Sequence, residues 1–522
     1  MTDDSLKGPL PGEAGPRLTE EATEDIGVVA KGGAVQIIGQ VSQRGLSFIF
    51  GAVVTRFLGP AGYGLYRLVV QIIAILSQVG LLGFNYAVMR FVAKGRAAKD
   101  PAAVKGAILT GVAGTIVSSV VVIAVTFALT TFIARNFTND PEELDDVRRL
   151  LPLVSPYILL YALLQVVRYA TQGYKTMVPS VLSGNVVQPV ARFVLAVGAL
   201  VIGFEVAGIL VALNISVAIA LGAALWWLRR LMTEAQWTAP ARFGFGPMLR
   251  FSVPQAGASL LGVQTLGLGM LILGRYHGTE AVGLFAIALS LQGPGNVFLG
   301  GIVNIWAPVV TDLYDRKEID RLGSLYKTIN RWIATFSFPV FAALLIEPDV
   351  FVELFAGDKG AEAVTAVAIL AVGNIFYTGT GPTGYVISMT GHPTVNFINS
   401  AIAVALYVGL GVAFVPEGGV VAMAWIDVLV TALINSVRVV QAYKLVGIHP
   451  YGRTFYKPVV ATLVAAAVLG AWHAIPGDNI LLDVAGIVVA LAAYLIALKR
   501  LGIDEEERHV LDRIRKRAIK RK

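Results

Sequence analysis

The chain has 522 residues, of which 56% are hydrophobic and 15% are charged, and its mean hydropathy is +0.71. These values exclude a soluble globular protein, in which about a quarter of the residues are charged. The net charge is +8 and cysteine is absent, which excludes disulfides, thiol catalysis and thiolate metal sites. The five histidines are scattered along the chain, so neither a metal centre nor a cofactor is expected.

The chain begins with an acidic segment rich in glycine and proline. Residues 1–33 contain KGPLPGEAGPRLTEEATED and lack the basic start and the apolar centre of a signal peptide. We expect this segment to be a disordered cytoplasmic tail. The first apolar stretch would then direct membrane insertion.

Apolar stretches of about 20 residues follow along the rest of the chain, and each can cross roughly 30 Å of hydrocarbon as a helix. The pattern predicts an all-α polytopic membrane protein with about fourteen transmembrane helices. The spans are expected at 34–56, 64–89, 106–134, 150–172, 178–203, 205–228, 249–274, 281–311, 328–347, 361–390, 394–415, 419–443, 456–475 and 480–499.

The loops between these spans differ in charge. Loops on the side of the N-terminus carry most of the lysines and arginines, including Arg90, Lys94, Arg229 and Arg230, whereas the opposite loops carry few. Basic loops stay in the cytoplasm, so both termini are predicted to be cytoplasmic in an inner or plasma membrane.

A weak duplication suggests how the spans are grouped. RFLGPAGYGLY at 56–66 returns as RYHGTEAVGLF at 275–285, and TQGYKTMVPS at 171–180 is echoed by MTGHPTVNFI at 389–398. An even number of spans per repeat gives two parallel six-helix lobes around a central cavity, an architecture of transporters. Chance similarity of glycine-rich turns is the alternative. The predicted organisation is a tail at 1–33, an N-lobe at 34–230, a C-lobe at 231–445, two further spans within 446–500, and a basic tail at 501–522.

Three arginines stand out because they are not duplicated. Arg44, Arg168 and Arg192 lie in apolar stretches without an acidic residue, where an uncompensated cation costs on the order of 3 kcal/mol. We expect them to face a wet cavity that receives an anion. An arginine fork suits phosphate, and amides or tyrosines suit sugar hydroxyls. The other predicted cavity residues are Gln40, Gln43, Gln71, Tyr161, Gln165, Asn185 and Gln188.

These polar groups also have a structural interpretation. Buried amides often join helices by hydrogen bonds, and arginines near helix ends can reach the headgroups. Two Gly-Pro interruptions, at Pro294 and Pro382, are candidate hinges or simple kinks. Asp427 is the one carboxylate placed deep in the membrane. It is expected to pair with Arg438, and the alternative is a role in coupling to H⁺ or Na⁺.

The C-terminal tail, LKRLGIDEEERHVLDRIRKRAIKRK, is strongly basic. We predict that it docks on the anionic lipids of the inner leaflet, where each Lys or Arg contributes about 1 kcal/mol. Nucleic-acid binding is the other use of such a run, and none is expected beside so many membrane spans.

Several motifs together resemble the multidrug/oligosaccharidyl-lipid/polysaccharide (MOP) exporter superfamily, and within it the polysaccharide-type flippases. They are the polar first span running into RFLGPAGYGLY, then GLLGFNYAVMRFVAKG, TQGYKTMVPSVLSGNVV, FGFGPMLRFSVPQAGASLL and GHPTVNFINS. The resemblance covers about residues 25–500 and implies a monomeric transporter rather than an enzyme. It implies movement of an undecaprenyl-diphosphate-linked oligosaccharide, or a similar lipid-linked glycan, from the inner to the outer leaflet by alternating access.

Two other transporter classes remain open. The related peptidoglycan-precursor flippases have an arginine placed like Arg44 upstream of Arg56 and Gly59, but their second arginine of this span is Phe50 here. A cation-coupled exporter of small amphiphiles needs cavity carboxylates, and Asp427 alone is available. An enzyme would need a catalytic loop outside the membrane, which the short predicted loops do not provide.

Overall fold

The computed structural model describes residues 20–138, 140–474 and 480–502, and these ranges are helices and their connections without a β-strand. The first helix, α1, begins at Glu20, within the segment expected to form the N-terminal tail. The helix-forming residues of this stretch continue the first span towards the N-terminus. Residues 1–19 and the basic tail from 503 onwards lie outside the described residues.

The first half of the chain forms nine helices within its described residues and one π-helical turn. They are α1 (Glu20–Leu81), α2 (Phe84–Ala97), α3 (Pro101–Ala128), α4 (Thr130–Phe137), α5 (Pro141–Val154), α6 (Pro156–Gln172), α7 (Val178–Val181), the π-turn η1 (Leu182–Val187), α8 (Gln188–Ile202) and α9 (Val206–Leu231).

The second half contains the remaining helices and two short 3₁₀ turns. They are α10 (Glu234–Thr238), α11 (Phe245–Leu291), η2 (Pro294–Asn296), α12 (Val297–Asp315), α13 (Ile319–Ile346), α14 (Pro348–Ala356), η3 (Gly357–Ala363), α15 (Val364–Thr380), α16 (Thr383–Met389), α17 (Pro393–Val446), α18 (Tyr456–His473) and α19 (Ile480–Arg500).

Most of these helices are suited to a membrane. Within the described residues, 8 helical stretches are long and apolar enough to span it, or up to 10 if each of two bent helix pairs counts as one span. Three long helices contain a non-helical glycine, namely Gly59 in α1, Gly278 in α11 and Gly419 in α17. A straight helix of 54 residues like α17 would measure about 80 Å, so the chain must turn there to stay within a bilayer. The chain is therefore a multi-pass membrane protein, and the number fourteen stays a prediction.

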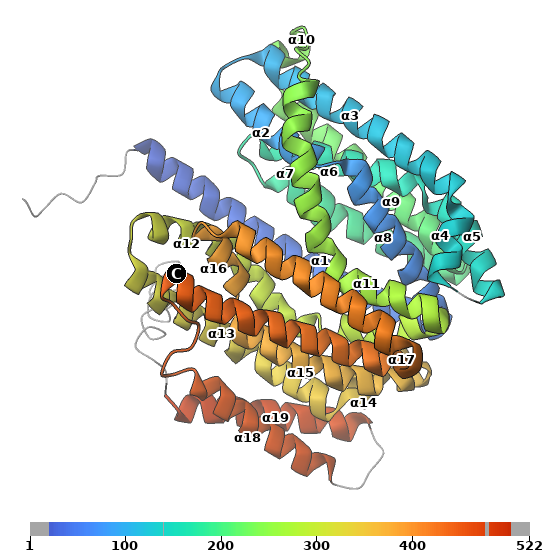
Figure 1. The fold of residues 1–522 in the computed structure, drawn as a ribbon, viewed down its shortest axis with the longest axis vertical. Helices are drawn as coiled ribbons and strands as arrows, with labels where there is room; N and C mark the ends of the chain where they lie inside the picture. Colours follow the sequence, from blue (N-terminus) through green and yellow to red (C-terminus); the bar gives the residue numbers. More distant parts are fainter. Residues whose placement is uncertain (1–19, 139, 475–479, 503–522) are drawn as a thin grey trace, which may run out of the picture.

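The helices form two groups in space (Figure 1). Helices α2–α9 lie in the upper group, α12–α17 lie in the lower group, and α18 and α19 pack together at the lower edge. The largest apolar core contains buried residues of both groups, such as Val54 and Ile73 of α1, Leu213 of α9, Phe285 of α11 and Tyr407 of α17. This shared core joins the two groups along α1 and α11.

The first pair of repeated motifs has the same local structure. Gly59 has φ 71° and ψ 179°, and Gly278 has φ 75° and ψ −172°, so each turn uses a backbone conformation that favours glycine. Gly173 and Gly391, from the second pair of motifs, differ, because only Gly391 has a positive φ, of 90°. The duplication is thus visible in the backbone at the first turn of each half.

Candidate functional site

A cavity of about 1210 Å³ lies between the two groups of helices. Its lining side chains come from α1, η1 and α8 on one side and from α11, α12, α15 and α17 on the other. Four arginines and one carboxylate, Asp427, are among these lining residues. The cavity is therefore strongly cationic.

Helix α1 supplies most of the first wall. Gln36, Gln40, Gln43, Arg44 and Ser47 recur at three- and four-residue intervals, which places them on one face of a helix, and all five line the cavity. Gln71, from the second part of α1, lines it as well and packs against Gly267 of α11. The polar stripe predicted from the sequence thus faces the cavity.

Arg44 reaches from α1 to the broken helix of the other half. Its Nη1 donates to the carbonyl oxygen of Asn296 at 3.0 Å, and its guanidinium lies over Gly300, where an added Cβ would come within 3.0 Å of it. The break is the η2 turn at Pro294, and the helical segments on its two sides are bent by 43°. The interruption therefore offers a backbone carbonyl to Arg44, and the Arg44 side chain remains exposed.

Arg192 and Arg67 hold two further positions on this wall. Arg192 of α8 donates to Ser47 Oγ at 3.2 Å, and its Cζ lies 4.6 Å from the centre of the Phe50 ring, a cation–π distance. Arg67 lies 5.9 Å from the centre of the Tyr63 ring. Neither arginine has a carboxylate within 4.0 Å among the described residues, so both remain available to an anion.

The opposite wall consists mainly of amides and hydroxyls that were not predicted as cavity residues from the sequence. Asn296 Nδ2 donates to Asn374 Oδ1 at 2.6 Å, and Tyr377, Thr431 and Asn435 also line the cavity. On α17, a polar stripe at four- and three-residue intervals lines the cavity, and it consists of Asp427, Thr431, Asn435 and Arg438.

Asp427 and Arg438 both line the cavity but do not pair, so that prediction is wrong. Tyr407 donates to Asp427 Oδ1 at 3.3 Å, and Arg438 Nη2 donates to Ser400 Oγ at 3.3 Å. The two charges are three helical turns apart on α17, a rise of about 16 Å, which is too far for a salt bridge.

Several other residues predicted for the cavity lie outside its lining. Arg168 of α6 donates to Ser180 O, Gln165 Oε1 and Asn185 Oδ1, so its guanidinium is bound within the protein. Tyr161 stacks on Tyr157, with ring centres 5.2 Å apart. Gln188 does not line the cavity, and neither does Pro382, the second predicted hinge, which directly precedes α16. The sequence indicated the polar character of these positions but not which neighbour they face.

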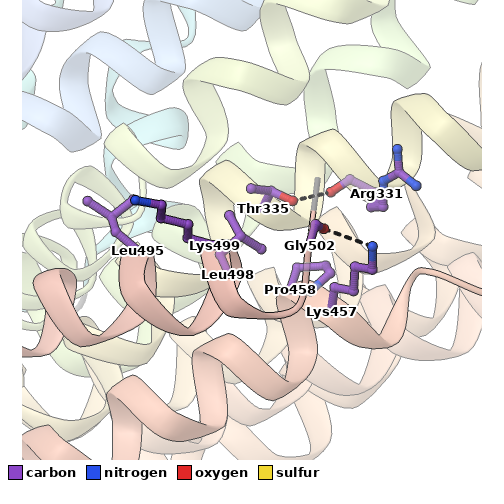
Figure 2. Close-up of a pocket in the computed structure, with 8 residues that line it drawn as sticks. All are labelled: Arg331, Thr335, Lys457, Pro458, Leu495, Leu498, Lys499 and Gly502. Atoms are coloured by element: carbon purple, nitrogen blue, oxygen red, sulfur yellow. Dashed lines mark hydrogen bonds between the residues drawn. The ribbon is translucent and has the colours of Figure 1, made fainter. Parts of the chain in front are cut away.

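A smaller cavity of about 180 Å³ lies between α13, α18 and α19 (Figure 2). Arg331, Lys457 and Lys499 line it together with Pro458, Leu495 and Leu498. Lys457 Nζ donates to the carbonyl oxygen of Gly502 at 2.9 Å. The smaller cavity shares no lining residue with the large cavity.

Comparisons with known proteins agree with this architecture. Residues 29–314 match the family described as polysaccharide biosynthesis protein. The teichuronic acid biosynthesis protein TuaB of Bacillus subtilis (strain 168) is 25% identical over 224 residues, which are 42% of this chain and 46% of that protein. The chain thus matches about half the length of this curated relative.

Solved structures share the fold at low identity. The lipid II flippase MurJ in an inward closed conformation has a TM-score of 0.73 and 12% identity, covering 88% of this chain and 97% of MurJ. A MATE family multidrug transporter of the MOP superfamily has a TM-score of 0.67 in its inward-facing conformation, at 15% identity, with 79% of this chain and 98% of that one covered. An outward-facing MATE transporter of the same superfamily has a TM-score of 0.60 at 15% identity, covering 83% and 99%. The chain belongs to the polysaccharide biosynthesis protein family and has the fold of the MOP superfamily.

Proposed function

We propose that this protein is a flippase that moves an undecaprenyl-diphosphate-linked oligosaccharide, or a similar lipid-linked glycan, from the inner to the outer leaflet. The observation that carries the proposal is the cavity between the two halves, which is lined by four arginines and one carboxylate. A cavity with this excess of positive charge suits an anionic headgroup. The family match adds that the substrate belongs to polysaccharide synthesis.

The two walls suit the two parts of such a headgroup. Arg44, Arg67 and Arg192 lie on the first wall, and a guanidinium binds phosphate oxygens through paired, charge-assisted hydrogen bonds. The amides and hydroxyls of the second wall, such as Asn374 and Asn435, can both donate to and accept from sugar hydroxyls. The diphosphate would bind at α1 and α8, and the sugars would extend towards α15 and α17.

The packing supports an inward-facing state. The two halves meet closely at the turns that follow Gly59 and Gly278. Just before the first turn, Arg56 Nη2 donates to the carbonyl oxygens of Glu353 and Leu354 of α14 at 3.1 and 2.9 Å. The polar stripe from Gln36 to Ser47 lies before the turn at Gly59, in the part of α1 whose beginning we expect, from the basic loops, to be cytoplasmic.

Alternating access would complete the cycle. Rocking of the two halves about the cavity would expose the headgroup outside while the lipid tail remains in the bilayer. An inside-negative potential favours outward movement of an anion by about 2.3 kcal/mol per charge for each 100 mV crossed. The diphosphate can therefore move outward without an obligatory coupling ion.

Deleting the gene tests this function. Mass spectrometry of the lipid fraction should reveal a diphosphate-linked oligosaccharide that builds up in the deletion strain and disappears on complementation with wild type. Build-up of the peptidoglycan precursor would instead indicate the related flippase activity. An unchanged lipid pool would contradict the proposal and favour export of small amphiphiles.

A further inference from the structure

A π-helical turn, η1 (Leu182–Val187), interrupts the helical stretch that carries Asn185 into the cavity. Such turns add a residue to the helix, disturb its regular hydrogen bonds, and occur frequently at functional sites. Ser180 and Ser183 at this turn are both 1% exposed. Their burial means that polar groups here must find partners within the protein.

Arg168 of α6 supplies several of these partners. Its Nε donates to Ser180 O at 2.9 Å, its Nη2 donates to Asn185 Oδ1 at 2.9 Å, and its Nη1 donates to Gln165 Oε1 at 3.2 Å. A planar guanidinium can make these three contacts at once, whereas the single ammonium of a lysine cannot reproduce their geometry. Arg168 thus joins α6 to Ser180, which precedes the π-turn, and to Asn185, which lies within it.

Gly184 makes room for this guanidinium. A Cβ added to Gly184 would come within 3.0 Å of Cζ, Nη1 and Nε of Arg168. Any larger residue at position 184 would therefore push the guanidinium away from Ser180 and Asn185. Gly198, further along the same helical stretch, has no atom within 4 Å of an added Cβ and offers a matched control.

The contact with Arg168 also fixes how Asn185 is oriented. A guanidinium only donates hydrogen bonds, so Asn185 must present its oxygen to Arg168 and turn its amide NH₂ the other way. That nitrogen, Nδ2, lies 3.5 Å from the position of a Cβ added to Gly39 on α1, next to the polar stripe. Asn185 thereby offers N–H donors between α1 and η1, on the wall that contains Arg44 and Arg192.

We propose that Arg168 is a positioning residue, which holds the π-turn and orients Asn185 as a hydrogen-bond donor for the oxygen atoms of the anionic headgroup. This inference rests on the proposed function, because it assumes that the cavity binds the glycan lipid. Arg168 itself does not touch the substrate. The charged Arg168 side chain places the neutral Asn185 amide beside the cavity arginines.

Two measurements on the full-length protein test this role. The first is hydrogen–deuterium exchange of residues 178–187 in the purified protein. The second is clearance of the accumulated lipid when variants are expressed in the deletion strain. Arg168→Lys and Gly184→Ala should each raise exchange in this segment and slow clearance about tenfold, the factor expected for loss of one charge-assisted hydrogen bond. Gly198→Ala should behave as wild type in both measurements.

The Asn185→Asp variant distinguishes orientation of the Asn185 donor from stabilisation of the π-turn alone. The new carboxylate still accepts from Arg168, so exchange should stay at the wild-type level, yet the N–H donors are lost and clearance should again fall about tenfold. Adding Arg168→Lys to Asn185→Asp should slow clearance by far less than a second tenfold step, because both changes remove the same donor.

Each contrary result has a defined meaning. Wild-type clearance by Arg168→Lys, with unchanged exchange, would overturn the positioning role. Wild-type clearance by Asn185→Asp would show that Arg168 braces the turn without presenting a donor, and would also overturn the proposal. A deletion strain without lipid build-up would overturn the proposed function, whereas the exchange measurement would still support or overturn the brace at η1.

Discussion

Gly64 of α1 and Gly283 of α11 are packed against each other's turn. A Cβ added to Gly64 would come within 3.0 Å of the carbonyl oxygen of Thr279, and a Cβ added to Gly283 would come within 3.0 Å of the carbonyl oxygen of Pro60. The two glycines occupy equivalent positions in the repeated motifs. The duplicated turns therefore form a reciprocal backbone contact that brings the two halves together at the end of the cavity opposite the polar stripe.

Gly283→Ala should loosen this contact. The methyl group would force apart two backbones that have no flexible side chain to move, so unfolding should require about 1–3 kcal/mol less free energy. Thermal unfolding of the purified protein in detergent would measure the change. Gly222→Ala is the control, because nothing lies within 4 Å of a Cβ there. Equal stability of the two variants would show that the contact is not tight.

Arg192→Lys should impair transport although it keeps the charge. Lysine cannot reproduce the planar guanidinium that stacks on Phe50, so clearance of the glycan lipid should fall roughly threefold to tenfold. Arg230 stacks on Trp226 at 3.9 Å but does not line the cavity, and Arg230→Lys should have no effect. The same loss in both variants would mean that the cation–π contact matters for folding alone.

Asp100 should make folding sensitive to acid. The Ala103 N–H and the nearby Arg242 guanidinium hold the pKa of this carboxyl below its ordinary value of 3.8. A lowered pKa means that the stabilisation is present above pH 3.8 and is lost as the pH falls through the folded-state value. The melting temperatures of wild type and Asp100→Asn, measured from pH 7 to pH 3, should therefore converge at the acid end. A constant difference would argue against the ion pair.

Asp427→Asn should leave clearance of the glycan lipid within about twofold of wild type. Asp427 bonds to the neutral Tyr407 rather than to a cation, and the membrane potential alone favours outward movement of an anion. Lipid analysis of the complemented deletion strain measures this. Loss of clearance, or loss of resistance to cationic drugs, would instead assign Asp427 a coupling role.

The sequence predicted the first wall better than the second. A polar stripe at helical spacing identified the cavity face of α1 around Arg44, because periodicity depends only on local geometry. Asn374 and Asn435 were not predicted as cavity residues, although Asn435 lies on a polar stripe of α17. Helical spacing does not show which helices meet, and this cavity depends on contacts between helices distant in the chain. The prediction that Arg168 lines the cavity differs from the structure. The sequence indicates neither the π-turn nor the face of α6 that packs against it. The predicted pairing of Asp427 with Arg438 neglected the rise of the helix between them.

The helix boundaries were also predicted only in part. The expected spans overlap the described helices except α10 and α14, because hydropathy and glycine turns are local signals. The break at Leu129 between α3 and α4 and the break at Ser155 between α5 and α6 were missed. Pro156 marks the second break in the sequence, whereas the first has no proline or glycine to signal it.

Flipping by the purified protein in lipid vesicles tests the central claim most directly. The vesicles would contain the glycan lipid recovered from the deletion strain, and periodate oxidation of accessible sugars would report movement between leaflets. We expect wild type to flip the lipid, Arg44→Ala to slow flipping at least about tenfold, and Arg44→Glu to abolish it, because we propose that this guanidinium binds the diphosphate. Equal rates for wild type, Arg44→Ala and Arg44→Glu would contradict the role of the cationic cavity.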